Sequence, residues 1–136
     1  MPTVATMLGH LQSRLLVLSI ASNSITVEGA KLLCPALEKH PFLRELCLDN
    51  NPIGDEGADS IFAAIRDGDV LESLSLSNCG MQACAWAPRL RIMTSLSRLG
   101  LARNKIDNRG FQNLCDGLQE TACLRELDVR LRFWLR

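Results

Sequence analysis

Leucines recur along this chain in the pattern Leu-x-x-Leu-x-Leu at nearly constant separation, and this period restricts the fold more than any other feature. Successive copies are separated by 28, 28, 25 and 28 residues. The copies begin at Leu15, Leu43, Leu71, Leu96 and Leu124. Thirteen of the fifteen pattern positions hold leucine, and Ile20 and Val129 hold the other two. A fixed period of roughly 20 to 50 residues indicates stacked repeats, each of which buries its apolar face against its neighbours.

The second half of each unit is also regular. Ten and six residues before the next start, apolar residues stand four positions apart, which places them on one face of a helix. These pairs are Leu33 and Leu37, Ile61 and Ile65, Trp86 and Leu90, and Leu114 and Leu118. Each unit is therefore predicted to contain a short strand, a turn and a helix of about three turns.

The complete unit, Leu-x-x-Leu-x-Leu-x-x-Asn/Cys-x-Ile, resembles the leucine-rich repeat family. Its 28-residue period with an asparagine or cysteine at one position is similar to the ribonuclease-inhibitor-type branch. Residues 43–65, "LRELCLDNNPIGDEGADSIFAAI", and residues 96–118, "LSRLGLARNKIDNRGFQNLCDGL", match at every apolar position. The resemblance implies an α/β leucine-rich repeat solenoid, a curved horseshoe segment with a parallel sheet on the concave face and helices on the convex face.

The length of 136 residues predicts a single domain over residues 1–136. It would hold four full repeats starting at 15, 43, 71 and 96 and a partial fifth from 124. Residues 1–14 are expected to end a preceding helix, and residues 130–136 to form a tail outside the repeat. Two interpretations of the tail stay open: the end of a piece of a longer solenoid, or an improvised cap. Uncapped ends would allow self-association through the last strand.

One position in each repeat is expected to be structural. The chain turns sharply after each strand, and a buried amide can satisfy the backbone groups left there. Asn23, Asn51 and Asn104 are predicted to form this ladder, with the weaker donor Cys79 replacing one rung. Gly29, Gly57 and Gly110 share one offset and are predicted to lie where the chain packs too closely for a β-carbon.

The third unit departs from the pattern. Met81 and Trp86 are five residues apart, where the other units have eight residues between the matching positions. Pro88 falls near the start of the shortened helix, where a proline is tolerated. The convex layer should be thinner here, either through simple drift of the repeat or as a notch that receives a ligand.

Neither the composition nor the motifs of the chain point to a catalytic site, a metal site or a nucleic-acid-binding surface. Lysine plus arginine and aspartate plus glutamate both number 15, so no basic excess points to nucleic acid or an anionic membrane. His10 and His40 fit no catalytic or zinc-ligand pattern, and no phosphate-binding loop occurs, so we expect no enzyme activity, metal or cofactor. The six cysteines include no Cys-x-x-Cys pair, and only Cys47 and Cys84 are expected to be accessible. Free reduced thiols favour a cytoplasmic, or alternatively nuclear, location.

The concave face is the predicted binding surface, because alternation along each strand points the third, fifth and seventh residues of a unit outward. The predicted partner-binding residues are Glu45, Cys47, Asp49, Ser73, Ser75, Arg98, Glu126, Asp128 and Arg130. The other outward positions are Val17, Ser19, Ala21, Ser77, Gly100 and Ala102. This surface has mostly small side chains and is mildly acidic. Because it is an extended surface without catalytic groups, we expect a protein-protein interaction scaffold or adaptor. The resemblance also allows a fragment of a Ran-type GTPase-activating protein or of an immune-receptor-like sensor.

Overall fold

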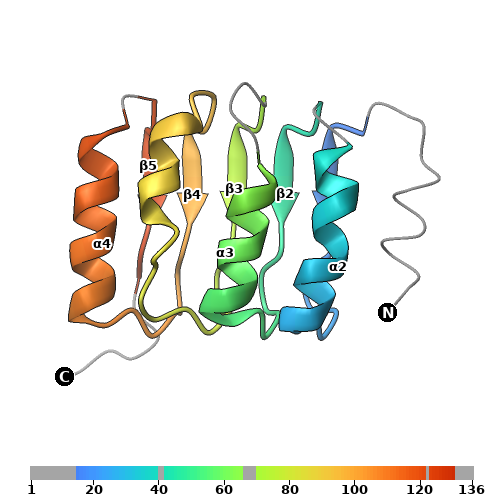
Figure 1. Ribbon diagram of the computed structural model, residues 1–136, viewed down its shortest axis with the longest axis horizontal. Coiled ribbons are helices and arrows are strands. Elements are labelled where there is room, and N and C mark those ends of the chain that lie inside the picture. Colours follow the sequence, from blue (N-terminus) through green and yellow to red (C-terminus); the bar gives the residue numbers. More distant parts are fainter. Residues whose placement is uncertain (1–14, 40–41, 66–69, 122, 131–136) are drawn as a thin grey trace.

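Each copy of the leucine pattern forms one short strand of a parallel sheet. The computed structural model describes residues 15–39, 42–65, 70–121 and 123–130. The segment expected at 1–14, the tail expected at 130–136 apart from Arg130, and both histidines lie outside the described residues. The strands are β1 (Val17–Ser19), β2 (Glu45–Cys47), β3 (Ser73–Ser75), β4 (Arg98–Gly100) and β5 (Glu126–Asp128). They lie side by side in the order β1-β2-β3-β4-β5 (Figure 1). Equivalent residues face one another, so Leu46 pairs with Leu18 on one side and Leu74 on the other.

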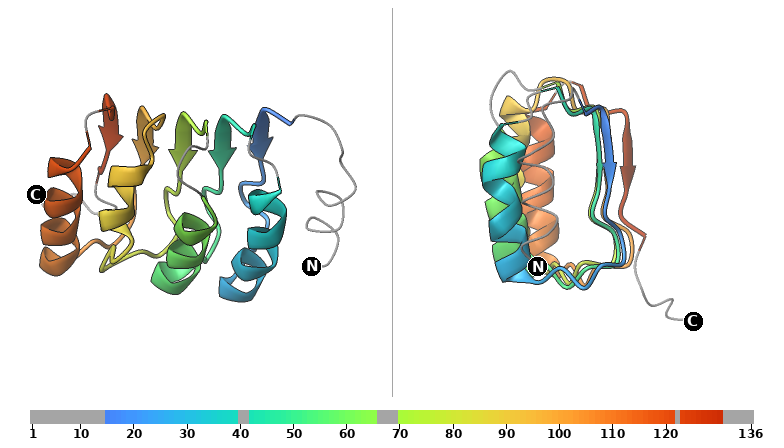
Figure 2. Two further views of the ribbon diagram at one scale, coloured as in Figure 1. Left: turned by 45° about the horizontal axis from the view of Figure 1, so that its top comes forward. Right: turned by 90° about the vertical axis from the view of Figure 1, so that its right-hand side faces the viewer.

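A layer of helices covers one face of this sheet. The helices are α2 (Val27–Glu38), α3 (Gly54–Ala64), the 3-10 helix η1 (Ala87–Ile92) and α4 (Asn108–Gln119). Seen along the row of repeats, the helices form one wall and the strands the other (Figure 2). The α/β solenoid predicted from the leucine period is confirmed, with α helices of 12, 11 and 12 residues.

The pattern leucines fill the space between the two layers. Leu46, Leu48 and Leu74 are at most 2% exposed. Burial weakens at the last described strand, where Leu127 is 36% exposed although its position in the unit predicts a buried side chain. Leu127 is more exposed because β5 lies at the edge of the described sheet and pairs only with β4.

Asn51 joins its own turn to the preceding repeat. Its Oδ1 accepts hydrogen bonds from the backbone N–H groups of Asn23 and Ile25 at 2.9 and 3.0 Å. Its Nδ2 donates to the carbonyl oxygens of Ile20 and Leu48 at 3.1 and 2.9 Å. Asn104 repeats this arrangement with its own neighbours, and both side chains are buried. The ladder is confirmed at these two rungs.

The other two rungs are weaker. Cys79 is buried and its Sγ donates to the carbonyl of Leu48 at 3.2 Å, as expected for the substitute rung. Asn23 was predicted to be a buried rung, but it is exposed and its Nδ2 donates only to the carbonyl of Ala21 among described groups. A rung reaches back to the repeat on its N-terminal side, and Asn23 belongs to the first repeat that the structure describes.

The close packing predicted at the helix starts is also confirmed. A β-carbon at Gly57 would lie 2.3 Å from Cγ2 of Ile53, and one at Gly110 would lie 2.0 Å from the carbonyl oxygen of Gln82. Both separations are far below van der Waals contact, so these positions require glycine.

The third repeat is thinner, as its length predicts, because η1 has six residues. The rings of Phe62 and Trp86 stack there with centroids 4.1 Å apart and planes 2° apart, and both side chains are buried. Arg89 adds a hydrogen bond from Nε to the carbonyl of Phe62 at 3.1 Å. The chain's own aromatic side chains therefore occupy the place where a notch was the alternative interpretation.

Asp55 secures the shortened loop from the neighbouring repeat. Its carboxylate accepts hydrogen bonds from three consecutive backbone N–H groups, those of Gln82, Ala83 and Cys84, at 3.1 to 3.3 Å. Asp55 lies in the first turn of α3, where a carboxylate favours the helix N-terminus. Its hydrogen bonds nevertheless go to a segment 27 to 29 residues away.

We expect Asn51→Ala to lower the free energy of unfolding by about 1–3 kcal/mol, because buried N–H and carbonyl groups lose their partners. Asn23→Ala is the matched control, since it removes the same side chain from an exposed rung. Chemical denaturation of both variants measures the difference. Equal destabilisation by the two substitutions would contradict a structural role for the buried rung.

We expect Asp55→Ala to destabilise the protein by about 1–2 kcal/mol through the loss of an acceptor for three N–H groups. Glu56→Ala, at the next residue, removes an exposed pair with Lys31 and should cost less than about 0.5 kcal/mol. Thermal unfolding of the two variants separates these effects. A larger loss of stability for Glu56→Ala than for Asp55→Ala would show that the hydrogen bonds to Asp55 contribute little.

Candidate functional site

The outer face of the sheet carries all nine residues predicted to bind a partner; we call this surface, formed by the outward positions of β1–β5, the sheet face. The register aligns these positions in two rows. The first row is Val17, Glu45, Ser73, Arg98 and Glu126. The second is Ser19, Cys47, Ser75, Gly100 and Asp128. Asp49 and Arg130 follow the strand ends and also lie at the surface, whereas Ala102, expected to face outward, is buried.

An ion pair crosses the middle of the first row. Nη2 of Arg98 on β4 lies 3.4 Å from Oε1 of Glu45 on β2, so the arginine spans the intervening strand β3. Only the small side chain of Ser73 stands between them in the row. Both charged side chains are about half exposed, so solvent screens the pair and it contributes little to stability.

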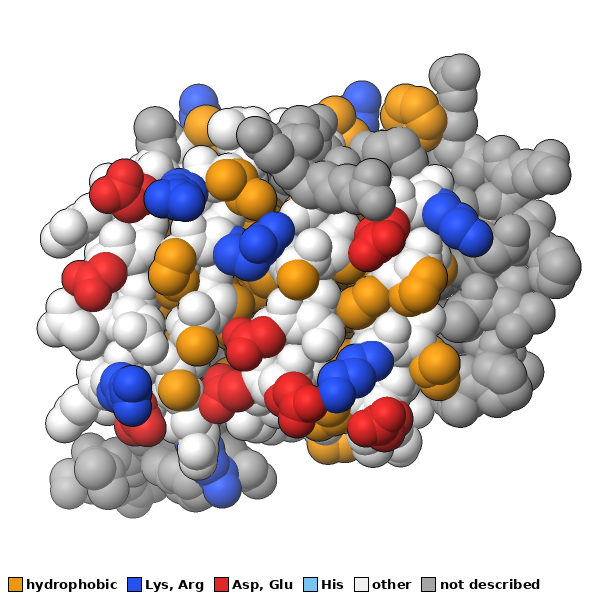
Figure 3. Space-filling model, viewed as in Figure 1, with side chains coloured by type: hydrophobic (Ala, Val, Ile, Leu, Met, Phe, Trp, Pro, Cys, Tyr) orange, Lys and Arg blue, Asp and Glu red, His pale blue; other side chains and the backbone are white. Residues whose placement is uncertain are grey.

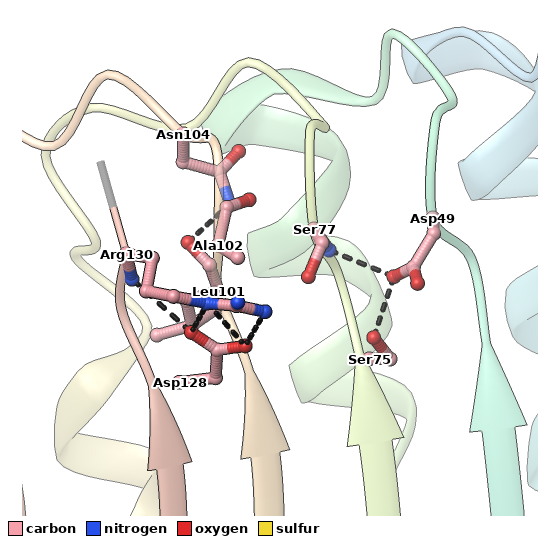
Figure 4. A network of polar contacts seen from close by, with 8 residues as sticks. All are labelled: Asp49, Ser75, Ser77, Leu101, Ala102, Asn104, Asp128 and Arg130. Atoms are coloured by element: carbon pink, nitrogen blue, oxygen red, sulfur yellow. Dashed lines mark hydrogen bonds and ion pairs between the residues drawn. The ribbon is translucent and has the colours of Figure 1, made fainter. Parts of the chain in front are cut away.

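The carboxylate of Asp49 organises the end of β3. Its Oδ1 accepts hydrogen bonds from Oγ of Ser75 at 2.6 Å and from the backbone N–H of Ser77 at 2.8 Å (Figure 4). Both donors are neutral, so the negative charge of Asp49 stays uncompensated within this group.

Asp128 and Arg130 form the second polar group of Figure 4, at the end of β5. Nε of Arg130 donates to Oδ1 of Asp128 at 2.9 Å, and Nη2 donates to Oδ2 at 2.8 Å. This two-point contact is the usual geometry of a guanidinium on a carboxylate. The hydrogen bonds from Arg130 lower the pKa of Asp128 below its ordinary value.

The sheet face is hollowed between β3 and β5. A depression of about 480 Å³ is lined there by Ser73, Ser75, Arg98, Gly100, Arg125, Glu126 and Asp128, with backbone from the intervening leucines. Gly100 contributes no side chain to it, and a β-carbon there would lie 2.7 Å from Oγ of Ser75. The sequence predicts that Gly100 faces outward but does not single it out as a functional residue. The one sequence feature that could have done so is that a glycine interrupts the row of outward side chains.

The helical face carries charged and apolar side chains side by side. Figure 3 shows acidic and basic side chains of the described helices interspersed with separate apolar ones. Leu32 on α2 is an exposed apolar residue, with 51% of its surface accessible. The sheet face combines a depression with charged groups around it, among them Arg98, Glu126 and Asp128.

The thiols are not set up for nucleophilic chemistry. Desolvation by burial raises the pKa of Cys79 to about 11 and that of Cys84 to about 12. Burial also raises the pKa of the half-buried Cys47 on the sheet face. These three thiols are therefore protonated at neutral pH, and a protonated thiol is a poor nucleophile.

Two expectations about cysteine exposure are wrong. Cys84, expected to be accessible, is buried because the shortened loop turns inward at this residue, with φ 49°. Cys115, expected to be a packed residue, is exposed. At the equivalent position of α2, Sγ of Cys34 is covered by α3 and donates to the carbonyl of Ser60, whereas no described helix follows α4.

Among residues 15–39, 42–65, 70–121 and 123–130, no group of three or more His, Cys, Asp or Glu side chains could hold a metal ion. Within the same ranges, no helix has both the length and the apolar character needed to cross a bilayer.

Comparison with known proteins agrees with this architecture. A family model described as "Leucine Rich repeat" matches residues 13–34 and 39–62. Ribonuclease inhibitor of Sus scrofa is 34% identical over 103 residues, and that of Mus musculus is 36% identical over 108 residues. The chain belongs to the leucine-rich repeat family. Its repeats are of the ribonuclease-inhibitor type, as their period and the asparagine or cysteine position indicated.

The alignments cover 73% and 76% of this chain but only 23% and 24% of the two inhibitors, so the chain spans about a quarter of these relatives. NACHT, LRR and PYD domains-containing protein 14 of Mus musculus is 33% identical over 82% of this chain and 12% of its own. Among solved structures, leiomodin-1 Actin-Binding Site 2 superposes with a TM-score of 0.78 at 17% identity, over 95% of this chain and 78% of that chain. This last likeness concerns the fold alone.

The thiols should react with iodoacetamide in the order of their exposure. At pH 8 we expect Cys115 to be alkylated first, Cys47 more slowly, and Cys79 and Cys84 only after unfolding, because a raised pKa lowers the thiolate fraction. Because the pKa of Cys47 is raised, its alkylation rate should still increase with pH in the range where a free cysteine is already fully ionised. Mass spectrometry of the modified peptides checks this, and early labelling of Cys84 would contradict its burial.

Proposed function

We propose that the sheet face binds a protein partner and that the chain acts as an interaction scaffold rather than as an enzyme. The observation that carries this proposal is the depression at β3–β5, ringed by Arg98, Glu126 and Asp128 on a broad exposed sheet. Two of the nine predicted residues, Arg98 and Arg130, are arginines, which often contribute strongly at interfaces. Glu45, Cys47, Asp49, Ser73 and Ser75 complete the proposed surface.

The relatives support a binding function. Ribonuclease inhibitors are named for the protein on which they act, and they share the repeat type of this chain. The alignment covers about a quarter of those inhibitors, so it carries over a way of binding and not a particular partner. The balanced charge of the chain argues against nucleic acid as the partner.

A second candidate is that the chain corresponds to the repeat portion of a sensor-type protein. The similarity to NACHT, LRR and PYD domains-containing proteins 14 and 5 of Mus musculus, each 33% identical, favours it. Sequencing the full-length transcript tests this candidate, because a nucleotide-binding module upstream of these repeats would support it. The Ran-type alternative has no matched catalytic residue in its favour.

We also propose a reducing compartment, cytoplasmic or nuclear. The six cysteines, all described as free thiols, occupy positions set by the repeat. Fractionation of cells that express the full-length protein tests the location. Self-association through β5 stays a prediction, supported by the partial exposure of Leu127.

A photo-crosslinking amino acid at Ser73 on the sheet face should capture the partner in cells, whereas the same group at Leu32 on the helical face should not. The captured protein, once purified, should bind Ser73→Arg at least about ten-fold more weakly than the unaltered chain, a loss of about 1.4 kcal/mol. Leu32→Arg is the matched control and should bind normally. Isothermal titration calorimetry measures both affinities.

Two results would count against the proposal. Stronger weakening by Leu32→Arg than by Ser73→Arg would place the partner on the helical face. A crosslink that joins only two copies of this chain would replace a foreign partner with self-association.

A further inference from the structure

Two carboxylates of the sheet face are already bound to arginines of the chain itself. Arg130 grips Asp128 through two nitrogens, at 2.9 and 2.8 Å, and Arg98 approaches Glu45 at 3.4 Å. Figure 4 shows the guanidinium of Arg130 against the carboxylate of Asp128, two residues earlier in the chain. These internal pairs show that the carboxylates of the sheet face can bind a guanidinium group.

Glu126 is left without such a partner. Arg98 is its direct cross-strand neighbour in the register, yet the guanidinium of Arg98 turns the other way, over β3 to Glu45. Glu126 is exposed and makes no ion pair or side-chain hydrogen bond with any described residue. Its negative charge is available to a molecule that approaches from outside.

The outward positions carry an excess of negative charge overall. The acidic residues among them are Glu45, Asp49, Glu126 and Asp128, and the basic residues are Arg98 and Arg130. Because neutral donors satisfy Asp49, its charge adds to that of Glu126 rather than being cancelled. A partner with a basic contact surface complements this face.

Gly100 provides the space for a side chain next to these carboxylates. It faces Asp128 on β5 and Ser75 on β3 in the register, and it leaves the floor of the depression open. Arg125 also lines the depression, but it lies three residues before Asp128, which is about 10 Å along a strand. Gly100 therefore lies beside Asp128, and Glu126 stands two residues before Asp128 on β5.

We propose that this depression seats one arginine or lysine side chain of a protein partner, with its stem over Gly100 and its cation against Asp128 and Glu126. The inference rests on the binding function proposed above for the sheet face and adds the chemistry of the contact. Arg130 holds Asp128 in the free protein, but this pair is exposed, with side chains 75% and 41% accessible. An incoming cation replaces Arg130 at little cost, since exposed pairs are weak.

This arrangement predicts opposite effects for two neighbouring substitutions. Asp128→Asn removes the acceptor and should weaken binding of a basic side chain. Arg130→Gln removes the internal competitor and should strengthen it. If instead the partner were acidic and bound to the arginines, Arg130→Gln would weaken binding.

The probe is a dye-labelled peptide in which four arginines alternate with glycines, compared with the same peptide carrying citrulline, the neutral isostere of arginine. Fluorescence anisotropy measures affinity at low and at physiological ionic strength, because screening reduces any purely long-range attraction. We expect the arginine peptide to bind and the citrulline peptide not to bind. Asp128→Asn should weaken the arginine peptide by about five-fold, and Arg130→Gln should tighten it.

Gly100→Leu tests the seat itself. The leucine is meant to fill the depression, and its β-carbon would lie 2.7 Å from Oγ of Ser75, the end of a side chain that can rotate, so we expect the fold to be retained. Ser19→Leu, in the same row on β1, is the matched control for a new leucine on the sheet face, and Asp116→Asn on α4 is the control for a lost charge. Thermal unfolding of every variant confirms that the comparison is between folded proteins.

The inference is overturned if the arginine peptide binds Asp128→Asn and Gly100→Leu as well as the unaltered chain, or if Arg130→Gln binds it more weakly. Testing the same variants against the crosslinked partner separates the two proposals. Loss of the partner with Gly100→Leu but not with Asp128→Asn would leave the sheet face as the binding surface and remove only the cation seat. No effect of either variant, together with none of Ser73→Arg, would remove both.

Discussion

The buried amides of Asn51 and Asn104 hold neighbouring repeats in a common register. A strand of three residues has few ladder hydrogen bonds of its own, and the sharp turn after it leaves backbone groups that no strand can satisfy. Each amide supplies donors and an acceptor at once, to its own turn and to the repeat before it. The alignment of outward side chains in rows on the sheet face depends on this fixed register, because a slip of one residue would turn each of them inward.

The extent to which sequence predicts this protein follows from the range of each interaction. The buried positions of Leu46, Leu48 and Leu74 follow from local alternation and were predictable. The contact of Asp55 with the loop at Gln82 was not, because it joins two repeats through a deletion that only one of them carries. Likewise, the sequence does not predict that Arg98 pairs with Glu45 rather than with Glu126, because both residues are acidic and lie in the same row.

The candidate site shows the same limit. Its nine residues follow from the strand period, and the structure places all of them on one face. The depression depends on Gly100, whose importance lies in what it lacks beside Ser75 and Asp128. Cys115 and Leu127 are exposed on the last described helix and strand, so their exposure reflects their place in the row of repeats rather than the repeat pattern.

The asparagine contacts also give the solenoid a direction. The Oδ1 atom of Asn104 accepts from the backbone N–H groups of Cys79 and Met81, so the residue restrains the turn of the third repeat more than that of the fourth. Between repeats, these contacts run from each asparagine to the repeat on its N-terminal side. Loss of one amide therefore frees backbone groups in the preceding repeat as well as in the turn that carries the asparagine. The carboxylates of Asp49 and Asp55 act in the opposite sense, because they accept hydrogen bonds from the repeat that follows them. The second repeat is therefore tied to both of its neighbours, and each of those neighbours contributes to its local stability.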